Sequence, residues 1–346
     1  MNKHHFSIQR FAALVISLFA IFYLLRIGKP ILSPLIFALL LAFLLRPLVS
    51  IYEQKLKQPV SSILLAMATV LLPLLLIGVL VSAQMSNVLS NFKGITTDIG
   101  TGLERILRWL ALTFSVPEAK VESWLSDNLS NFMNYPAEIL TAGLGSSVQV
   151  IGSVFLCFIF IFFILLYRRS FYQFFLYQFG PQSRTSANDM LQRIVLMTKD
   201  YLHGLLVVML ILAVLNSLGL YLIGIRLAFF WGALGAILAI IPFVGTALGG
   251  LLPFLYALAT FGLAWQPVAV VIFYAAVQSV EGNLITPKVV GNSVEVNPFI
   301  AIVALLVGGT FWGVAGMILS LPMVAICRIV FENIDLLRPI GELLRD

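Results

Sequence analysis

The polar segment 278–298, which lies between two long apolar blocks, holds the residues with the clearest capacity for chemistry. Glu281 follows directly on an apolar run, and Asn283 and Lys288 come soon after it. A carboxylate at the centre of a lipid bilayer costs about 2.5–3.5 kcal/mol, so such residues usually serve ions, protons or substrates. At the membrane surface this cost largely disappears, and the residue needs no functional explanation. Glu281 is therefore the first candidate for a group that binds or couples during transport, with an interfacial position as the alternative.

Further candidates lie in the same segment and in the apolar block before it. Pro242 and Gly245 interrupt that block, and broken helices can offer backbone groups to a ligand. Arg226 stands in a short gap between apolar runs, where an arginine is either a substrate contact or a topology anchor. His203, near the start of another run, is a candidate proton relay. The candidate transport residues are Arg226, Pro242, Gly245, Glu281, Asn283, Pro287, Lys288, Gly291 and Asn297.

The sequence lacks the motifs of the common catalytic and nucleotide-hydrolysing sites. It contains no G-x-x-x-x-G-K-[ST], no H-E-x-x-H and no G-x-S-x-G. Cys157 and Cys327 each lie alone in an apolar stretch, without a second cysteine or a histidine at metal-ligand spacing. We therefore expect no enzyme activity, no cofactor, no metal site and no disulfide, and no ATP-driven transport by this chain alone.

Composition identifies the surroundings in which these residues must work. Hydrophobic residues make up 60% of the 346 positions and charged residues 10%, against about 25% charged in a soluble domain. The apolar runs are continuous and lack the alternation of barrel strands, so they predict transmembrane helices. The net charge of +6 does not indicate nucleic-acid binding, because Lys and Arg stand at the ends of apolar runs. The predicted partners are lipids and a small-molecule or ion substrate.

The order of the apolar runs predicts an all-α, polytopic bundle of about eight spans, with ten as the alternative. Blocks 227–264 and 299–330 are rich in Gly and Pro and are expected to be broken or re-entrant. Segment 84–145 is more charged, and its two amphipathic patterns predict a helical insertion outside the membrane. The predicted organisation is 1–83 for spans one to three, 84–145 for the insertion, 146–200 for span four and a basic loop, and 201–346 for the transport core.

The distribution of Lys and Arg predicts the orientation. One side of the predicted topology, which includes both termini and the loop 168–200, carries about twice as many of these residues as the other. The positive-inside rule places that side in the cytoplasm and the insertion outside.

Two stretches of the C-terminal half repeat one pattern. Residues 231–239 (WGALGAILA) match residues 312–320 (WGVAGMILS), and a proline follows each, at Pro242 and Pro322. Many transporters contain structural repeats whose discontinuous helices meet at the binding site. The same small residues also allow close helix packing and self-association in membrane proteins of any function. The pattern alone is compatible with both interpretations.

Four motifs resemble those of the autoinducer-2 exporter family, also called PerM-like permeases. They are RLAFFWG at 226–232, IPFVG at 241–245, TPKVVG at 286–291 and FWG through LP at 311–322. The resemblance extends over nearly the whole chain and implies a multipass permease of the bacterial inner membrane. Members of this family are linked to export of autoinducer-2 and others to sodium/proton antiport. The family often has a polar residue where this chain has Ala239, which argues against an ion ligand there.

Three functional hypotheses follow. The first is a secondary exporter of small organic solutes, in which the broken helices around Pro242 and Pro287 line the path and Glu281 binds or couples. The second is a cation/proton antiporter in which Glu281 titrates. The third is a passive channel or a membrane scaffold.

Overall fold

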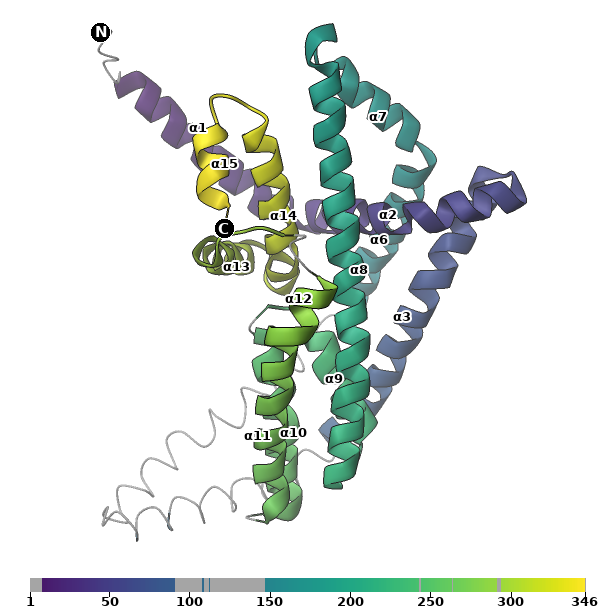
Figure 1. Cartoon of the computed structure of the whole chain (residues 1–346), viewed down its shortest axis with the longest axis vertical. Coiled ribbons are helices and arrows are strands. Elements are labelled where there is room, and N and C mark those ends of the chain that lie inside the picture. Colours follow the sequence, from purple (N-terminus) through teal and green to yellow (C-terminus); the bar gives the residue numbers. More distant parts are fainter. Residues whose placement is uncertain are drawn as a thin grey trace. The chain divides into compact units, whose positions relative to one another are not determined.

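Every secondary-structure element in the computed structural model is helical among the residues that it describes, which are 8–90, 108, 112, 147–242, 244–262, 264–290 and 294–345 (Figure 1). Among these residues, 5 helices are long and apolar enough to cross a membrane, or 6 if one bent pair forms a single span. Shorter apolar helices of 10–17 residues accompany them. These features confirm the predicted polytopic helical bundle. The predicted insertion 84–145 lies almost entirely outside the described residues.

The described helices fall into two compact units, and each unit draws on segments that are far apart in the sequence. Unit 1 comprises residues 1–64, 148–199 and 294–346, and unit 2 comprises residues 65–147 and 200–293. The helices are α1 Ile8–Ile27, α2 Lys29–Leu56, α3 Pro59–Ser90, α6 Ser147–Leu166, α7 Arg168–Tyr177, η1 Pro181–Ser183, α8 Arg184–Ile223, α9 Ala228–Leu238, α10 Val244–Phe261, α11 Trp265–Val280, the π-helix η2 Glu281–Ile285, α12 Thr286–Val289, α13 Pro298–Trp312, α14 Val314–Glu332 and α15 Arg338–Leu344.

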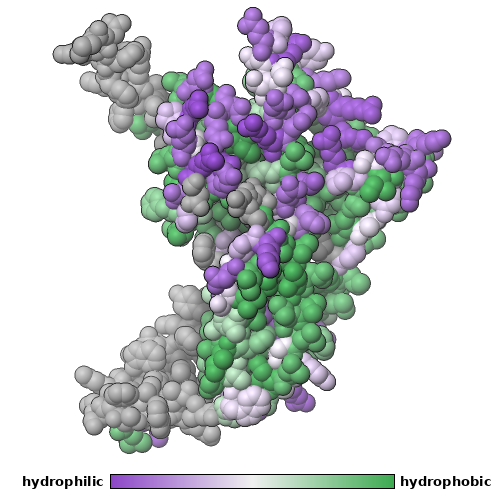
Figure 2. All heavy atoms as spheres, in the orientation of Figure 1, coloured by the Kyte–Doolittle hydropathy of each residue, from purple (hydrophilic) through white to green (hydrophobic). Residues whose placement is uncertain are grey.

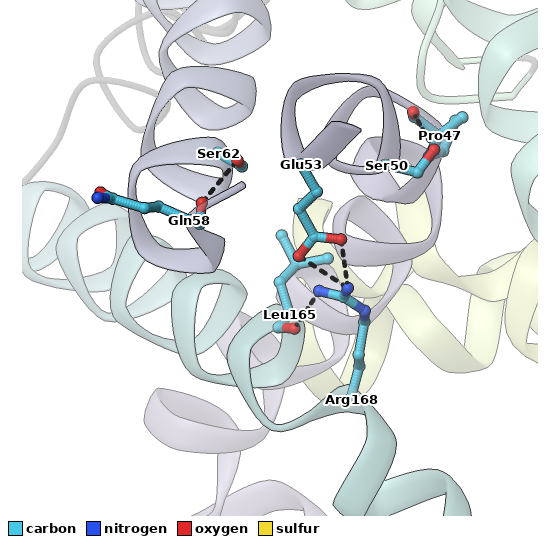
Figure 3. A network of polar contacts seen from close by, with 7 residues as sticks. All are labelled: Pro47, Ser50, Glu53, Gln58, Ser62, Leu165 and Arg168. Carbon is cyan, nitrogen blue, oxygen red and sulfur yellow. Dashed lines mark hydrogen bonds and ion pairs between the residues drawn. The ribbon is translucent and has the colours of Figure 1, made fainter. Parts of the chain in front are cut away.

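In unit 1, an ion pair joins two segments that the charge count assigns to one side of the membrane. Arg168, at the start of α7, places Nη2 2.8 Å and 2.6 Å from the two carboxylate oxygens of Glu53 in α2 (Figure 3). Its Nη1 donates to the carbonyl oxygen of Leu165 at 3.0 Å. The guanidinium thus also pairs a carbonyl at the end of α6, where the helix bends by 69° into α7.

The predicted basic loop 168–200 is largely helical. It forms α7 and the first part of α8, which runs for 40 residues from Arg184. At 1.5 Å per residue this helix is about twice as long as a bilayer core is thick. Its charged start, which belongs to unit 1, therefore extends beyond the apolar stretch that begins near Tyr201.

Unit 2 is built around α8 and the hairpin of α9 and α10, which packs in turn against α11. Its core contains Leu220, Trp231, Leu252 and Val270, one from each of these four helices. Trp265, Val268 and Ile272 of α11 are all more than half exposed, as expected for a lipid-facing surface. Figure 2 shows hydrophobic side chains over the lower part of the molecule, where α11 lies in Figure 1. With 11 residues, α9 is about half as long as a bilayer-spanning helix, so block 227–264 is broken at Pro242 as predicted.

Each copy of the repeated sequence pattern supplies a glycine to a helical hairpin. In unit 2, Gly235 of α9 packs against Gly249 of α10, and a Cβ at Gly249 would lie 3.1 Å from the Cα of Gly235. In unit 1, a Cβ at Gly316 of α14 would collide with the backbone of Gly308 in α13. Gly313, between these two helices, has a φ of +64°, which suits glycine. In both copies the small residues allow helices to approach at backbone contact.

The contact between α13 and α14 predicts that alanine destabilises the protein at Gly316 but not at Gly152. We expect Gly316→Ala to destabilise the protein by about 1–3 kcal/mol, because the methyl group must force the hairpin apart. Gly152→Ala in α6 is the matched control, since a Cβ there meets nothing within 4 Å. Because alanine favours helices by up to about 1 kcal/mol over glycine, the control should melt at or above the wild-type temperature.

Thermal unfolding of the purified variants in detergent measures both effects. A Gly316→Ala protein as stable as the Gly152→Ala protein would contradict the hairpin packing.

Candidate functional site

The helix that carries Glu281 changes its winding at that residue. After α11, residues 281–285 form the π-helix η2, and α12 continues from Thr286. Pro287 explains the change, because its ring clashes with the carbonyl of Asn283 and it has no N–H to donate to that group in an α-helix. The backbone N–H of Thr286 donates instead to the carbonyl of Glu281, five residues earlier. Such π segments occur frequently at functional sites.

The Glu281 carboxylate is half-buried and accepts hydrogen bonds from both sides of this segment. Gln278 Nε2, one turn earlier in α11, donates to Oε2 at 2.9 Å. The Thr286 hydroxyl, at the start of α12, donates to Oε1. The carboxylate therefore bridges the π segment through neutral groups that belong to the same helical stretch.

Charge pairing sets Glu281 apart from the other glutamates of the described chain. Those form ion pairs with arginine, namely Glu53, Glu295, Glu332 and Glu342. Glu281 forms no ion pair with any residue that the structure describes. Its negative charge is thus available to a proton, a cation or a polar substrate.

The neighbouring candidates contribute less to this geometry. Asn283 is exposed, and its Nδ2 donates to the carbonyl oxygen of Ser279 at 2.8 Å, a local helix contact. Pro287 and Lys288 are exposed on α12. Gly291 lies outside the described residues. Of the candidates in the polar segment 278–298, the structure therefore places Glu281, Asn283, Pro287 and Lys288 on one helical stretch that contains the π segment.

Asn297 belongs to unit 1 and caps a helix there. Its Oδ1 accepts from the backbone N–H of Phe299 at 2.9 Å, and Pro298 occupies the first position of α13. Its own N–H donates to the carbonyl of Leu344 at 3.0 Å. These contacts account for an asparagine at this position without a ligand.

The candidates around α9 are turn residues. Pro242 lies between α9 and α10, and its carbonyl accepts from the N–H of Val244 at 2.7 Å. Gly245 is buried, and a Cβ there would collide with the carbonyl of Leu238. Arg226 is exposed in the turn between α8 and α9, and His203 is exposed on α8.

An apolar cluster holds the helical stretch of α11, η2 and α12 against α8 and α9. Val208 and Leu212 of α8 are buried in it, together with Ala236 of α9, and Val277, Ile285 and Val289 pack around them. Ala239 belongs to the same cluster, so its surroundings are apolar. The cluster leaves the polar residues of η2 on the other sides of the helix.

Sequence reasoning missed a second polar group in unit 2. Asn216 of α8 is 3% exposed, and its Oδ1 has no hydrogen-bond partner in the described chain. The same is true of the buried hydroxyl of Tyr274 in α11. Each unpaired buried polar group costs about 1–3 kcal/mol. The only signal in the sequence is an amide inside the apolar run 205–222, which is a common event in membrane helices.

No three His, Cys, Asp or Glu side chains gather in a metal-binding arrangement among the described residues. The polar groups just described are carboxylate, amide and hydroxyl groups, which bind protons, cations or hydrogen-bonding solutes.

Two known proteins resemble this chain over most of its length, and a third resembles a shorter part of it. The putative transport protein YueF of Bacillus subtilis is 25% identical over 319 residues, which cover 87% of this chain and 83% of YueF. The AI-2 transport protein TqsA of Escherichia coli is 24% identical over 329 residues, covering 93% of this chain and 91% of TqsA. The putative transport protein YrrI of B. subtilis is 31% identical over 131 residues, 38% of this chain and 36% of YrrI.

The chain also matches a whole family at residues 11–335, which include all four motifs of the predicted resemblance. That family is described as AI-2E family transporter. The match confirms the resemblance, and the apolar helices agree with a multipass membrane protein. The chain therefore belongs to the AI-2E family of transporters.

Proposed function

We propose that this protein is a secondary exporter of small organic solutes of the autoinducer-2 type, located in the bacterial inner membrane with both termini in the cytoplasm. Family membership supports a transporter, and the name of TqsA suggests the substrate type. The charge distribution supports the orientation.

The observation that carries the mechanism is the unpaired charge of Glu281 at a break in a helix. The carboxylate holds Gln278 on one side of the π segment and Thr286 on the other. A proton, cation or substrate that binds Glu281 competes with these two donors for the carboxylate oxygens. In this proposal, weakening of either hydrogen bond changes the π segment between α11 and α12, so occupancy of the carboxylate is coupled to the shape of the helix.

The other candidates take supporting roles in this proposal. Asn283 and Lys288 line the solute path beside Glu281, and Pro287 maintains the break. Pro242 and Gly245 shape the turn of the α9–α10 hairpin, and Arg226 contributes at the other end of α9. Gly291, in the same polar segment, stays a candidate path residue, and Asn297 acts as a helix cap.

A second candidate function is cation/proton antiport, in which Glu281 exchanges a proton for sodium. The absence of an arginine or lysine partner for Glu281 in the described chain favours it, because such a carboxylate can be neutralised by either ion. The apolar surroundings of Ala239 weigh against it, since a cation prefers several oxygen ligands.

Transport by purified protein in proteoliposomes distinguishes these functions. We expect efflux of labelled autoinducer-2 from wild-type vesicles, and a loss on the order of tenfold or more in Glu281→Gln, as expected when charged hydrogen bonds of about 1.5–3 kcal/mol are removed. Glu342→Gln is the matched control, because Glu342 is exposed and, among the described residues, its carboxylate pairs with exposed Arg338.

A pH-sensitive dye in the same vesicles, under a sodium gradient, tests the antiporter. Sodium-driven proton movement that disappears in Glu281→Gln, without efflux of autoinducer-2, would replace the exporter by the antiporter.

The hydrogen bond between Thr286 and Glu281 predicts a second effect. We expect Thr286→Val to lower the maximal efflux rate severalfold, because the carboxylate loses its donor on the α12 side of the π segment. Thr286→Ser keeps a hydroxyl and should retain most of the rate.

Initial efflux rates at saturating solute measure this difference. Equal rates for the valine and serine variants would exclude a role for the hydroxyl.

A further inference from the structure

An exposed aromatic ridge runs from the end of α6 onto α7. Its four members follow one another at spacings of three or four residues, as neighbours on one helix face do: Phe163, Tyr167, Phe171 and Phe174. Their exposed fractions are 46%, 51%, 55% and 66% in that order. The rings of Phe163 and Tyr167 stack with their centroids 6.1 Å apart. Aromatic surface of this kind marks a contact with a membrane or with another protein.

Another side of α7 is fixed to the rest of unit 1. Arg168 pairs with Glu53 of α2 (Figure 3). Phe175 packs in a cluster whose buried members include Met190 of α8. These contacts hold α7 in place and leave the aromatic ridge on the outside.

The bend between α6 and α7 directs α7 along the membrane surface. With 20 residues, α6 is about 30 Å long, which is the thickness of a bilayer core, so α7 begins near a surface. The two helix axes differ by 69°. If α6 is tilted by about 20°, the average for transmembrane helices, α7 lies between about 50° and 90° from the bilayer normal. The short helix therefore runs through the headgroup region, as interfacial helices do.

A cationic row accompanies the ridge. Arg169, Gln173 and Tyr177 are spaced by four residues on α7, and all three are exposed. Arg184, at the start of α8, lies over the Tyr177 ring, with Cζ 5.3 Å from the ring centroid. Segment 168–188 contains no Asp or Glu. Neither Arg169 nor Arg184 forms an ion pair with any residue that the structure describes, so two guanidinium charges beside α7 are available to an anion.

Charge selects the occupant of this surface. Two copies of the chain that met here face to face would bring these arginines together without an acidic residue in segment 168–188 to balance them. A phospholipid with an anionic headgroup offers a phosphate, which arginine binds through paired hydrogen bonds, and a polar–apolar boundary, which aromatic rings favour. The segment also belongs to the side that the positive-inside rule assigns to the cytoplasm, where the leaflet is anionic.

We propose that α7 is an interfacial helix whose aromatic ridge lies in the headgroup layer, and that Arg169 and Arg184 bind the phosphate of an anionic phospholipid there. Because α7 joins α6 to the start of α8, this lipid contact ties both helices to the membrane surface. The proposal is independent of the solute that the protein transports.

The depth of the ridge is measured with a nitroxide label at Phe174→Cys in the full chain, after replacement of Cys157 and Cys327 by serine. The protein is placed in vesicles of phosphatidylcholine and phosphatidylglycerol. Molecular oxygen concentrates in the membrane and a nickel chelate stays in water, so relaxation of the label by each reagent reports its surroundings. We expect the Phe174 label to respond more to oxygen. The matched control is Gln173→Cys, on the cationic row of the same helix, which should respond more to the chelate.

Binding of a fluorescent short-chain phosphatidylglycerol to the purified full chain in uncharged detergent tests the arginines. We expect the combined variant Arg169→Gln and Arg184→Gln to raise its Kd by about fivefold for each arginine, as for cationic residues near an anionic surface. Lysine at both positions keeps the charge and should restore much of the affinity. Arg338→Gln combined with Arg345→Gln is the matched control, because these arginines pair with glutamates. Glycerol phosphate, which lacks acyl chains, should bind much more weakly than the lipid.

Several results would overturn the proposal. A Phe174 label that responds mainly to the chelate would place the ridge in water, and a label that responds to neither reagent would show that protein covers it. Unchanged lipid binding in the Arg169 and Arg184 glutamine variant, or an equal loss in the control pair, would leave the arginines without a specific role. Equal binding of glycerol phosphate and phosphatidylglycerol would make the site one for free phosphate.

Discussion

A chain in a lipid bilayer must pair its polar groups internally, and this constraint underlies the features described here. Pro287 removes a backbone donor, and the chain responds with a π segment in which Thr286 pairs with the carbonyl of Glu281. The Glu281 side chain takes the hydroxyl of the same threonine. Arg168 similarly serves both Glu53 and the end of α6. Against this background, the unpaired charge of Glu281 is the feature on which the proposed mechanism rests.

Glycine is the second constraint on the fold, because it lets the helices of two hairpins, α9–α10 and α13–α14, pack at backbone contact. Gly235 meets Gly249 in unit 2, and Gly308 meets Gly316 in unit 1. In both units the observed role of the repeated sequence pattern is therefore close helix packing.

The sequence predicted the helical class, the break at Pro242 and the family, because these depend on long apolar runs and on ordered motifs. It did not predict the π segment or the pairing of Glu281 with Thr286, since a spacing of five residues does not match an α-helix. The sequence did not single out Asn216, because its neighbours on α9 and α11 are far from it in the sequence and lie near it only in the folded chain. The concentration of polar residues in segment 278–298 selected Asn297, whose side chain caps α13 in the structure. The insertion 84–145 and Gly291 stay predictions.

The central claim is that the π segment between α11 and α12 changes its geometry when Glu281 binds a proton, a cation or a solute. It is tested most directly by electron spin resonance distance measurements between labels at Ile272, which is 64% exposed, and exposed Lys288, after replacement of Cys157 and Cys327. The account predicts that adding autoinducer-2, or introducing Glu281→Gln, shifts the distance distribution or adds a second population. Identical distributions in wild type, with solute and in Glu281→Gln would contradict it, because the π segment would then be a rigid feature of the fold.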